Sequence, residues 1–189
     1  LSTRFSPGER VAVWAPNIPQ WIFMEYACAL AGLVLVTANP SFQARELRYV
    51  LEQSGAVALF LVETFRGNPM AEIMNGVCDK LPAIKHRILL TDPAALFDGE
   101  DKGELRNPKP GDPVQIQYTS GTTGFPKGAL LHHNGLVRNA IDAMARGGLE
   151  PGDKIVHHMP LFDTTGCAVM ALGILSRGST MLLAPVFDP

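Results

Sequence analysis

The sequence has few cysteines and little excess charge of either sign. It holds three cysteines, Cys28, Cys78 and Cys167, and this odd, widely spaced set excludes a disulfide framework and predicts buried, reduced thiols. Acidic and basic residues nearly balance, at a formal net charge of -2, so no basic surface for nucleic acid is expected.

Long hydrophobic runs are also missing. The longest apolar stretch, residues 27–38, is too short to span a bilayer and is interrupted by Gly32. No charged segment followed by an apolar core marks a signal peptide. These absences predict a cytoplasmic enzyme with no integral membrane segment. With 47% hydrophobic residues, the chain can still bury substantial cores in one or two subdomains.

What is present is an alternation of strand-like and helix-like segments. Apolar, β-rich runs predict strands at 10–14, 33–37, 57–62, 87–90, 114–118, 129–131, 154–158 and 180–183. Helical periodicity between them predicts helices at 20–31, 44–53, 69–80, 134–145 and 165–175. The pattern indicates an α/β fold with largely parallel sheets and helices on both faces, in which sites gather at the carboxyl ends of the strands.

Residues 92–113 differ from the rest, with four prolines and six acids against three bases. This composition is typical of a solvated surface connection rather than a docking site. It divides the chain into a first α/β portion at 1–91, the connection at 92–113, and a second α/β portion at 114–189.

The second portion contains a run of glycines and hydroxyl side chains, YTSGTTGFPKG, over residues 118–128. Glycines let the backbone approach a ligand closely, and backbone N–H groups, hydroxyls and one ammonium are donors for phosphate oxygens. A plain linker is the alternative from composition alone, but the flanking strands favour a binding loop for a polyphosphate. It is not a Walker A loop, because Pro126 precedes Lys127 and Gly128 follows it.

This run closely resembles the phosphate-binding signature of the adenylate-forming superfamily, which includes acyl-CoA synthetases, peptide-synthetase adenylation domains and luciferases. Further resemblances to the family occur at Ala31-Gly32, at Asn39-Pro40, in the stretch ELRYVL at 46–51, and at His133 after the loop. The stretch PLFDTTG at 160–166 resembles a later family block of the form P-L-F-H-x-x-G. The details are most similar to fatty or medium-chain acyl-CoA ligases, and they imply the large N-terminal domain of such an enzyme.

The resemblance implies that a carboxylic acid, fatty in this group of ligases, reacts with ATP to give an acyl-adenylate, whose acyl group passes to coenzyme A. Mg²⁺ would accompany the phosphates. The residues implied for phosphate binding are Thr119, Ser120, Gly121, Thr122, Thr123, Gly124 and Lys127. Those implied for the substrate pocket are Phe162, Asp163, Thr164 and Gly166. No catalytic residue or metal ligand is assigned, and structural roles are expected for His132, His133, His157 and His158.

The family's adenine-binding motifs and its later catalytic lysine do not occur in the sequence. We therefore expect a fragment of a longer enzyme that is inactive alone and associates with itself through a cut apolar face or an open strand edge. Asp163 departs from the histidine common in acyl-CoA ligases, and it could point away, bind a cation or mark another substrate class. Two alternatives stay open: an adenylation domain that loads a carrier protein, and a non-catalytic self-associating fragment.

Overall fold

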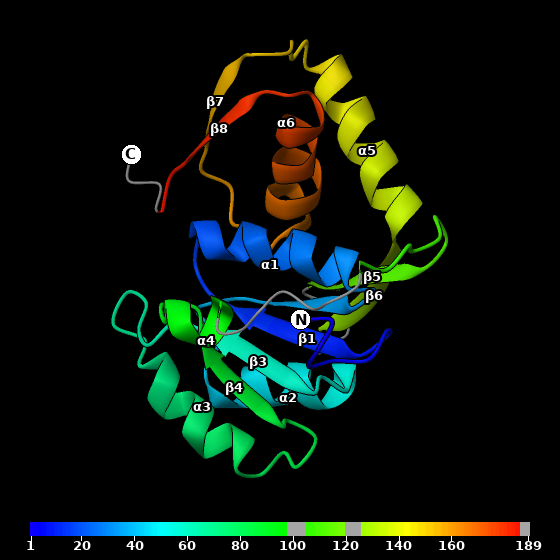
Figure 1. The fold of residues 1–189 in the computed structure, drawn as a ribbon. Helices are drawn as coiled ribbons and strands as arrows, with labels where there is room; N and C mark the ends of the chain where they lie inside the picture. The colour runs from blue at the N-terminus through cyan, green and yellow to red at the C-terminus, as the bar shows by residue number, and fades with distance from the viewer. Residues whose placement is uncertain (98–104, 120–125, 186–189) are drawn as a thin grey trace.

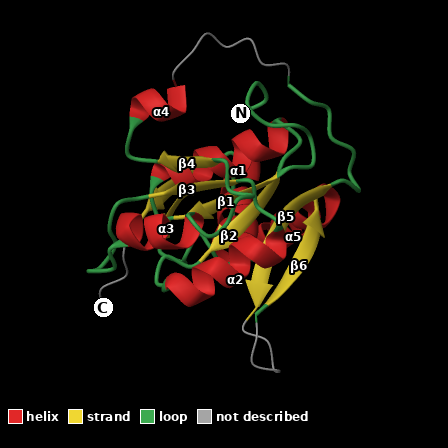
Figure 2. Cartoon of the chain, turned by 90° about the horizontal axis from the view of Figure 1, so that it is seen from below, coloured by secondary structure: helices red, strands yellow, loops and turns green. Residues whose placement is uncertain are grey.

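The computed structural model describes residues 1–97, 105–119 and 126–185, and a six-stranded sheet lies at its centre (Figure 1). The strands are ordered β4-β3-β1-β2-β5-β6, and Figure 2 shows them side by side. All neighbouring pairs are parallel except β5 and β6. In chain order the strands are β1 Arg10–Trp14, β2 Val34–Ala38, β3 Ala58–Leu61, β4 His86–Leu89, β5 Pro113–Thr119 and β6 Lys127–His132.

Helices cover both faces of this sheet. Helix α1, Pro19–Leu30, lies on one face, and α2, Ala44–Ser54, and α3, Met70–Cys78, lie on the other (Figure 1). Beyond α1 stand α5, His133–Arg146, the helical segment η1, Thr165–Ala171, and α6, Leu172–Ser176. A separate pair of parallel strands, β7 Lys154–His157 and β8 Thr180–Leu183, packs beside them. The α/β fold with helices on both faces is thus confirmed.

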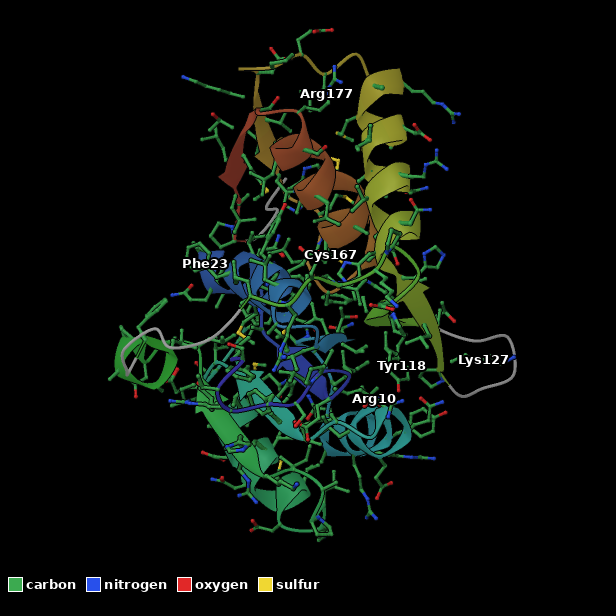
Figure 3. The ribbon with its side chains drawn as sticks, turned by 45° about the vertical axis from the view of Figure 1, so that its right-hand side comes forward. Arg10, Phe23, Tyr118, Lys127, Cys167 and Arg177 are labelled. Atoms are coloured by element: carbon green, nitrogen blue, oxygen red, sulfur yellow. The ribbon has the colours of Figure 1, made fainter. Side chains whose placement is uncertain are left out.

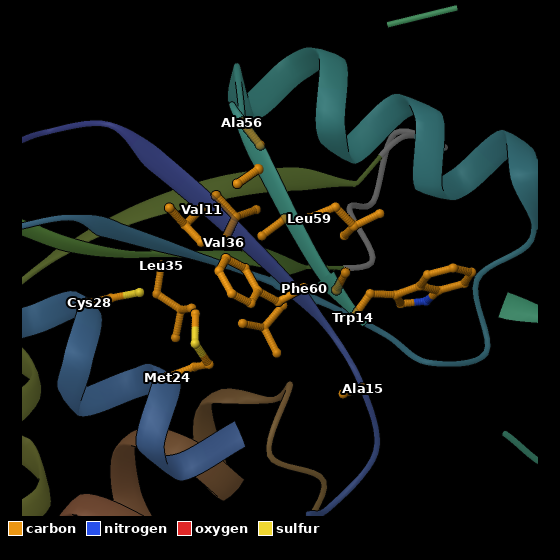
Figure 4. Packing of buried hydrophobic residues seen from close by; sticks show 14 of the residues in the cluster. Val11, Trp14, Ala15, Met24, Cys28, Leu35, Val36, Ala56, Leu59 and Phe60 are labelled. Carbon is orange, nitrogen blue, oxygen red and sulfur yellow. The ribbon is translucent and has the colours of Figure 1, made fainter. Parts of the chain in front are cut away.

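The core is densest around β1 and β2, because helices bury both faces of these strands. Figure 4 shows Met24 and Cys28 of α1 packed toward Leu35 of β2. A strand covered on both sides has no polar face, which explains the continuous apolar runs of the sequence. All three cysteines are free and buried, as the sequence predicts. Among the described residues, no helix has the length and apolar character needed to cross a membrane.

Element boundaries agree with the expected ones to within two residues in most cases. Helix α2 ends at Gly55, whose φ of 66° is left-handed, so glycine there closes the helix without strain. At its start, the Gln43 N–H donates to the Glu46 carboxylate in a capping box.

Three features differ from the expected elements. A short helix, α4 at Pro93–Phe97, begins the segment expected to be an irregular connection. Strands β5 and β6 are antiparallel, because the seven residues between them are too few for a crossover that would make them parallel. The helix expected at 165–175 begins with the π-helical turns of η1 and becomes α-helical only at α6.

An acidic residue lies inside the apolar layer between α1 and the sheet. Glu25 is 6% exposed, and within the part of the chain that the structure describes neither carboxylate oxygen has a hydrogen-bond partner. It borders a cavity of about 120 Å³ whose walls are largely apolar, including Leu35, Leu136 and Leu172. Burial raises the pKa of Glu25 to about 8, and the nearby Gln115 amide offsets a small part of this rise. Glu25 is therefore a neutral acid in the folded chain at neutral pH.

Glu25→Gln is expected to stabilise the fold at neutral pH and to flatten the pH dependence of stability. Because the folded pKa lies above the ordinary value of 4.5, the folded state keeps a proton that the unfolded state loses, so stability falls as pH rises from about 4.5 to 8. Near pH 7 the variant should gain roughly 3 kcal/mol, at about 1.4 kcal/mol per pH unit. Urea unfolding at pH 5, 6, 7 and 8 measures this. The exposed Glu72→Gln is the control, and equal slopes for wild type and E25Q would contradict the assignment.

Candidate functional site

The candidate phosphate loop is held at the carboxyl edge of the large sheet. The parallel strands β1, β2, β3 and β5 end together at this edge, and the antiparallel β6 begins there. The β5–β6 pairing sets Thr119 directly opposite Lys127, so both ends of the glycine-rich run are fixed. Figure 3 shows Lys127 at this end of the sheet, on the same side as Tyr118. The other five residues predicted to bind phosphate lie outside the described residues: Ser120, Gly121, Thr122, Thr123 and Gly124.

The exit of the loop is anchored to α2. The Tyr49 hydroxyl donates to the Pro126 carbonyl at 3.0 Å. On β5, which leads into the loop, the Tyr118 hydroxyl donates to the Gln53 side chain of the same helix. Burial raises the pKa of Tyr118 to about 12, so its phenol is neutral and packs rather than reacts. Gly128 lies beneath this ring, and a Cβ there would meet Tyr118 Cζ at 3.2 Å. The anchored exit leaves the Lys127 side chain exposed at the edge.

The segment predicted to contact the acyl substrate follows β7 and is held against the large sheet by Asn17. The Asn17 amide donates to the carbonyls of Met159, at 3.0 Å, and Ala184, at 3.2 Å. Its side-chain oxygen accepts the Leu161 N–H at 2.8 Å. Because Asn17 comes just after β1, these three bonds bring the substrate segment to the carboxyl edge that also carries the loop.

Phe162 and His158 line an open cleft of about 390 Å³ at this edge. Asn17, Asn39 and Arg66 line it as well, from turns that follow β1, β2 and β3. Arg66 has a φ of 47°, rare for a residue other than glycine, and its guanidinium lies 5.7 Å from the centre of the Phe65 ring. The cleft therefore combines apolar walls with one cation, a surface suited to an amphipathic anion.

Asp163 turns its carboxylate toward the backbone of its own turn. Its Oδ1 accepts the Thr165 N–H at 2.9 Å, and its own N–H donates to the Pro160 carbonyl at 3.1 Å. An acid at the start of a helical segment satisfies donors that would otherwise be unpaired. This capping role accounts for an aspartate here without requiring a cation or a different class of substrate.

The structure shows the surroundings of the four histidines for which structural roles are expected: His132, His133, His157 and His158. His132 rather than His133 caps α5, since its Nδ1 accepts the Gly135 N–H at 3.1 Å, while the His133 N–H donates to the Asp112 carbonyl. His157 is fully buried, and burial lowers its pKa, so it is neutral. Neighbours on a strand face opposite ways, and only His158 reaches the cleft.

Sequence reasoning missed Asn17 and Arg66 as residues of this edge. Asn17 lies in the turn Asn17-Ile18-Pro19 after the strand expected at 10–14. Nothing in this short stretch indicates that Asn17 binds a segment more than 140 residues away. Arg66 lies in the segment that follows β3, and the rule that sites gather after parallel strands could have drawn attention to it.

Gly166→Ala is expected to destabilise the fold by roughly 3 kcal/mol or more, because overpacking forces backbone shifts. A Cβ at this position would lie 1.9 Å from the Pro160 carbonyl oxygen, a backbone atom that cannot move aside cheaply. Thermal and urea unfolding measure the loss. Gly76→Ala in α3, where a Cβ meets nothing within 4 Å, is the control and should stabilise by about 0.5–1 kcal/mol. Equal stability of the two variants would contradict the close packing.

Comparison with known proteins finds similarity to acyl-CoA ligases. The 189 residues are 31% identical to the medium-chain acyl-CoA ligase ACSF2, mitochondrial, of Bos taurus, over 100% of this chain and 36% of that protein. The chain thus spans little more than a third of the curated relative's length.

Solved structures share the fold. The N-terminal domain of FACL13 from Mycobacterium tuberculosis superposes with a TM-score of 0.85 at 24% identity, over 99% of this chain and 46% of that chain. ATP-bound MatB from Rhodopseudomonas palustris gives 0.82 at 25% identity, over 98% of this chain and 37% of that chain. The family described as AMP-binding enzyme matches residues 2–189. The chain therefore belongs to the AMP-binding enzyme family.

Proposed function

We propose that this chain is part of an ATP-dependent acyl-CoA synthetase that activates a carboxylic acid, a fatty acid in our assignment, and transfers it to coenzyme A. The observation that carries the proposal is the β5–β6 hairpin, which fixes Thr119 opposite Lys127 at the carboxyl edge. Ligands of open α/β sheets bind outside this edge. The name of the Bos taurus relative supports an acyl-CoA product, and the ATP-bound structural neighbour supports ATP as the second substrate.

The proposed reaction has two steps. A carboxylate oxygen of the acid attacks the α-phosphorus of ATP, the bond to the bridging oxygen breaks, and pyrophosphate leaves with the electron pair. The coenzyme A thiolate then attacks the acyl carbonyl carbon, and AMP leaves. An anion attacks a polyanion in the first step, so positioning and charge neutralisation supply most of the catalysis.

Each part of the edge has a proposed role in this reaction. Lys127 and the loop beginning at Thr119 would bind the β- and γ-phosphates, with the Lys127 ammonium as a mobile point charge. Mg²⁺ would enter with ATP and neutralise part of the phosphate charge, and we assign no described residue of this chain to hold it. The segment with Phe162, Asp163, Thr164 and Gly166 would form one wall of the acid site, Phe162 facing the cleft and Asp163 shaping the turn. Loading of a carrier protein in place of coenzyme A is the second candidate.

In the complete synthetase, Lys127→Ala should lower the rate constant for acyl-adenylate formation by about ten- to hundredfold. The substitution removes one charge-assisted contact with phosphate, worth roughly 1.5–3 kcal/mol. Transfer of the acyl group from preformed acyl-adenylate to coenzyme A should be unchanged. Pyrophosphate exchange and single-turnover transfer measure the two half-reactions separately.

Lys154→Ala is the matched control for this test, because Lys154 is an exposed lysine at the start of β7, away from the hairpin. It should leave both half-reactions at wild-type rates. A Lys127→Ala enzyme that adenylates normally but fails in transfer would show that the loop is assigned to the wrong step.

The 189 residues alone should form no acyl-CoA, because the family's adenine-binding motifs and later lysine are not in this sequence. They should instead associate with one another. Val156 of β7 and Leu182 of β8 are more than half exposed on a sheet whose two strands are both edges, and α1 exposes Phe23. Open edges and apolar patches favour pairing between copies.

Sedimentation velocity of the 189-residue chain should show dimers or larger species as concentration rises. Val156→Lys should shift the distribution toward monomer, since a charge on an edge strand opposes edge-to-edge pairing. Lys154→Glu, a change of charge at an already charged position of the same strand, is the control. A strict monomer at the highest concentration reached would contradict the self-association proposed for this chain.

A further inference from the structure

A cluster of polar side chains joins β5 to the substrate segment inside the core. Gln115 and Gln117 lie two residues apart on one face of β5 and are 1% and 4% exposed. Gln117 Nε2 lies 2.9 Å from Cys167 Sγ and 3.0 Å from Gln115 Oε1. The Thr164 hydroxyl donates to Gln117 Oε1 at 3.1 Å. One amide therefore uses both ends of its side chain to connect the two segments.

The cluster reaches further into the substrate segment through Cys167. The Cys167 thiol lies 3.2 Å from the Asp163 carbonyl oxygen, and the Cys167 N–H donates to the same oxygen at 3.0 Å. Burial raises the pKa of this thiol, so it stays protonated and acts as a weak hydrogen-bonding group rather than a nucleophile. Figure 3 shows Cys167 between α6 and the large sheet. The first turns of η1 thus rest on Gln117 through a fixed chain of contacts.

Gln117 lies between the proposed phosphate loop and the proposed acid site. Gln117 is two residues from Thr119, the first residue of the proposed phosphate loop, and it lies on the strand that carries that loop. Thr164 belongs to the proposed wall of the acid site. In the first step of the proposed reaction the phosphates of ATP must meet the carboxylate of the acid. The buried Gln117 amide connects the segment proposed to bind the phosphates to the segment proposed to bind the acid.

We propose that Gln117 is a positioning residue for acyl-adenylate formation, holding the acid site in register with the phosphate loop. This inference rests on the proposed function. Reactants held in near-attack geometry react far faster, and a misplacement of about 1 Å can cost on the order of a hundredfold in rate. A buried amide can hold two segments in this way, because leaving its N–H₂ or its oxygen without a hydrogen bond in the core costs free energy. The side chain is therefore held in the orientation in which both ends are hydrogen-bonded.

The first test replaces Gln117 by methionine in the complete synthetase, which keeps the shape of the side chain and removes its hydrogen bonds. The rate constant kcat for pyrophosphate exchange should fall about ten- to hundredfold, while KM for ATP and KM for the acid change less than about threefold. If Gln117 has only a structural role, Gln117→Met will lower Tm and leave kcat per folded enzyme unchanged. That result would overturn the proposal.

The conservative variant Gln117→Glu should restore activity in a pH-dependent way. A neutral carboxyl can accept from Thr164 and donate toward Gln115 or Cys167, as the amide does, and burial favours the neutral form. The variant should approach wild-type kcat at low pH and lose activity as pH rises, after correction for the wild-type pH profile. A pH-independent loss as deep as that of Q117M would contradict the hydrogen-bonding role.

A neighbouring pair of threonines supplies a matched control. Thr164→Val removes the hydroxyl that binds Gln117 and should reproduce part of the Q117M effect, with little added loss in the double variant. Thr165→Val changes the next residue, whose backbone N–H rather than its hydroxyl binds Asp163, and should leave kcat unchanged. Additive effects of Gln117→Met and Thr164→Val would overturn the coupling.

Hydrogen exchange separates this proposal from the proposed function. In Gln117→Met the amide of Cys167, bonded to the Asp163 carbonyl, should exchange faster, whereas amides of β1 should not change. If the unsubstituted enzyme adenylates no acid, the proposed function fails, and faster exchange still shows that Gln117 holds the segment. Unchanged exchange at Cys167 would overturn the proposal whatever the activity.

Discussion

The parallel pairing of β2 with β5 is the interaction on which the rest of the structure depends. It joins Leu35 to Gln115 and Val36 to Ile116, which lie on opposite sides of residues 92–113 in the sequence. Because the pairing is parallel, β5 ends at the same edge as β1 and β2, and the glycine-rich run starts there rather than at the opposite edge. The strand then offers one face to α2 through Tyr118 and the other to the substrate segment through Gln117.

Two clamps of different kind bring the substrate segment to this edge. Asn17 binds backbone groups just after β7 and just after β8, and Gln117 binds the side chains of Thr164 and Cys167, which lie between these strands in the sequence. Backbone contacts fix where the segment lies, and side-chain contacts fix how its turn is oriented. Both clamps use buried amides, which combine a donor and an acceptor in one neutral group and so tolerate burial better than a charge would.

The sequence predicts the elements well and their three-dimensional partners poorly. Apolar runs and the glycine at position 55 give the ends of β1 and α2 closely, because burial and backbone geometry act locally. The clamp at Asn17, the neutral Glu25 and the π-helical turns at 165–171 depend on residues far apart in sequence, so no local pattern indicates them. The glycine-rich run is found from composition and order, whereas its anchoring by Tyr49 is visible only in the fold.

The neutral state of Glu25 changes the net charge of the folded chain. A formal charge count of -2 treats this residue as an anion, so the folded chain is about one charge less negative than its composition states. The neutral Glu25 by itself moves the isoelectric point of the native state upward from the sequence value of 6.2, and burial of His157, which lowers the pKa of that residue, opposes this shift. Unfolding near neutral pH releases that proton to the buffer, and the calorimetric heat of unfolding will include the heat with which the buffer takes it up.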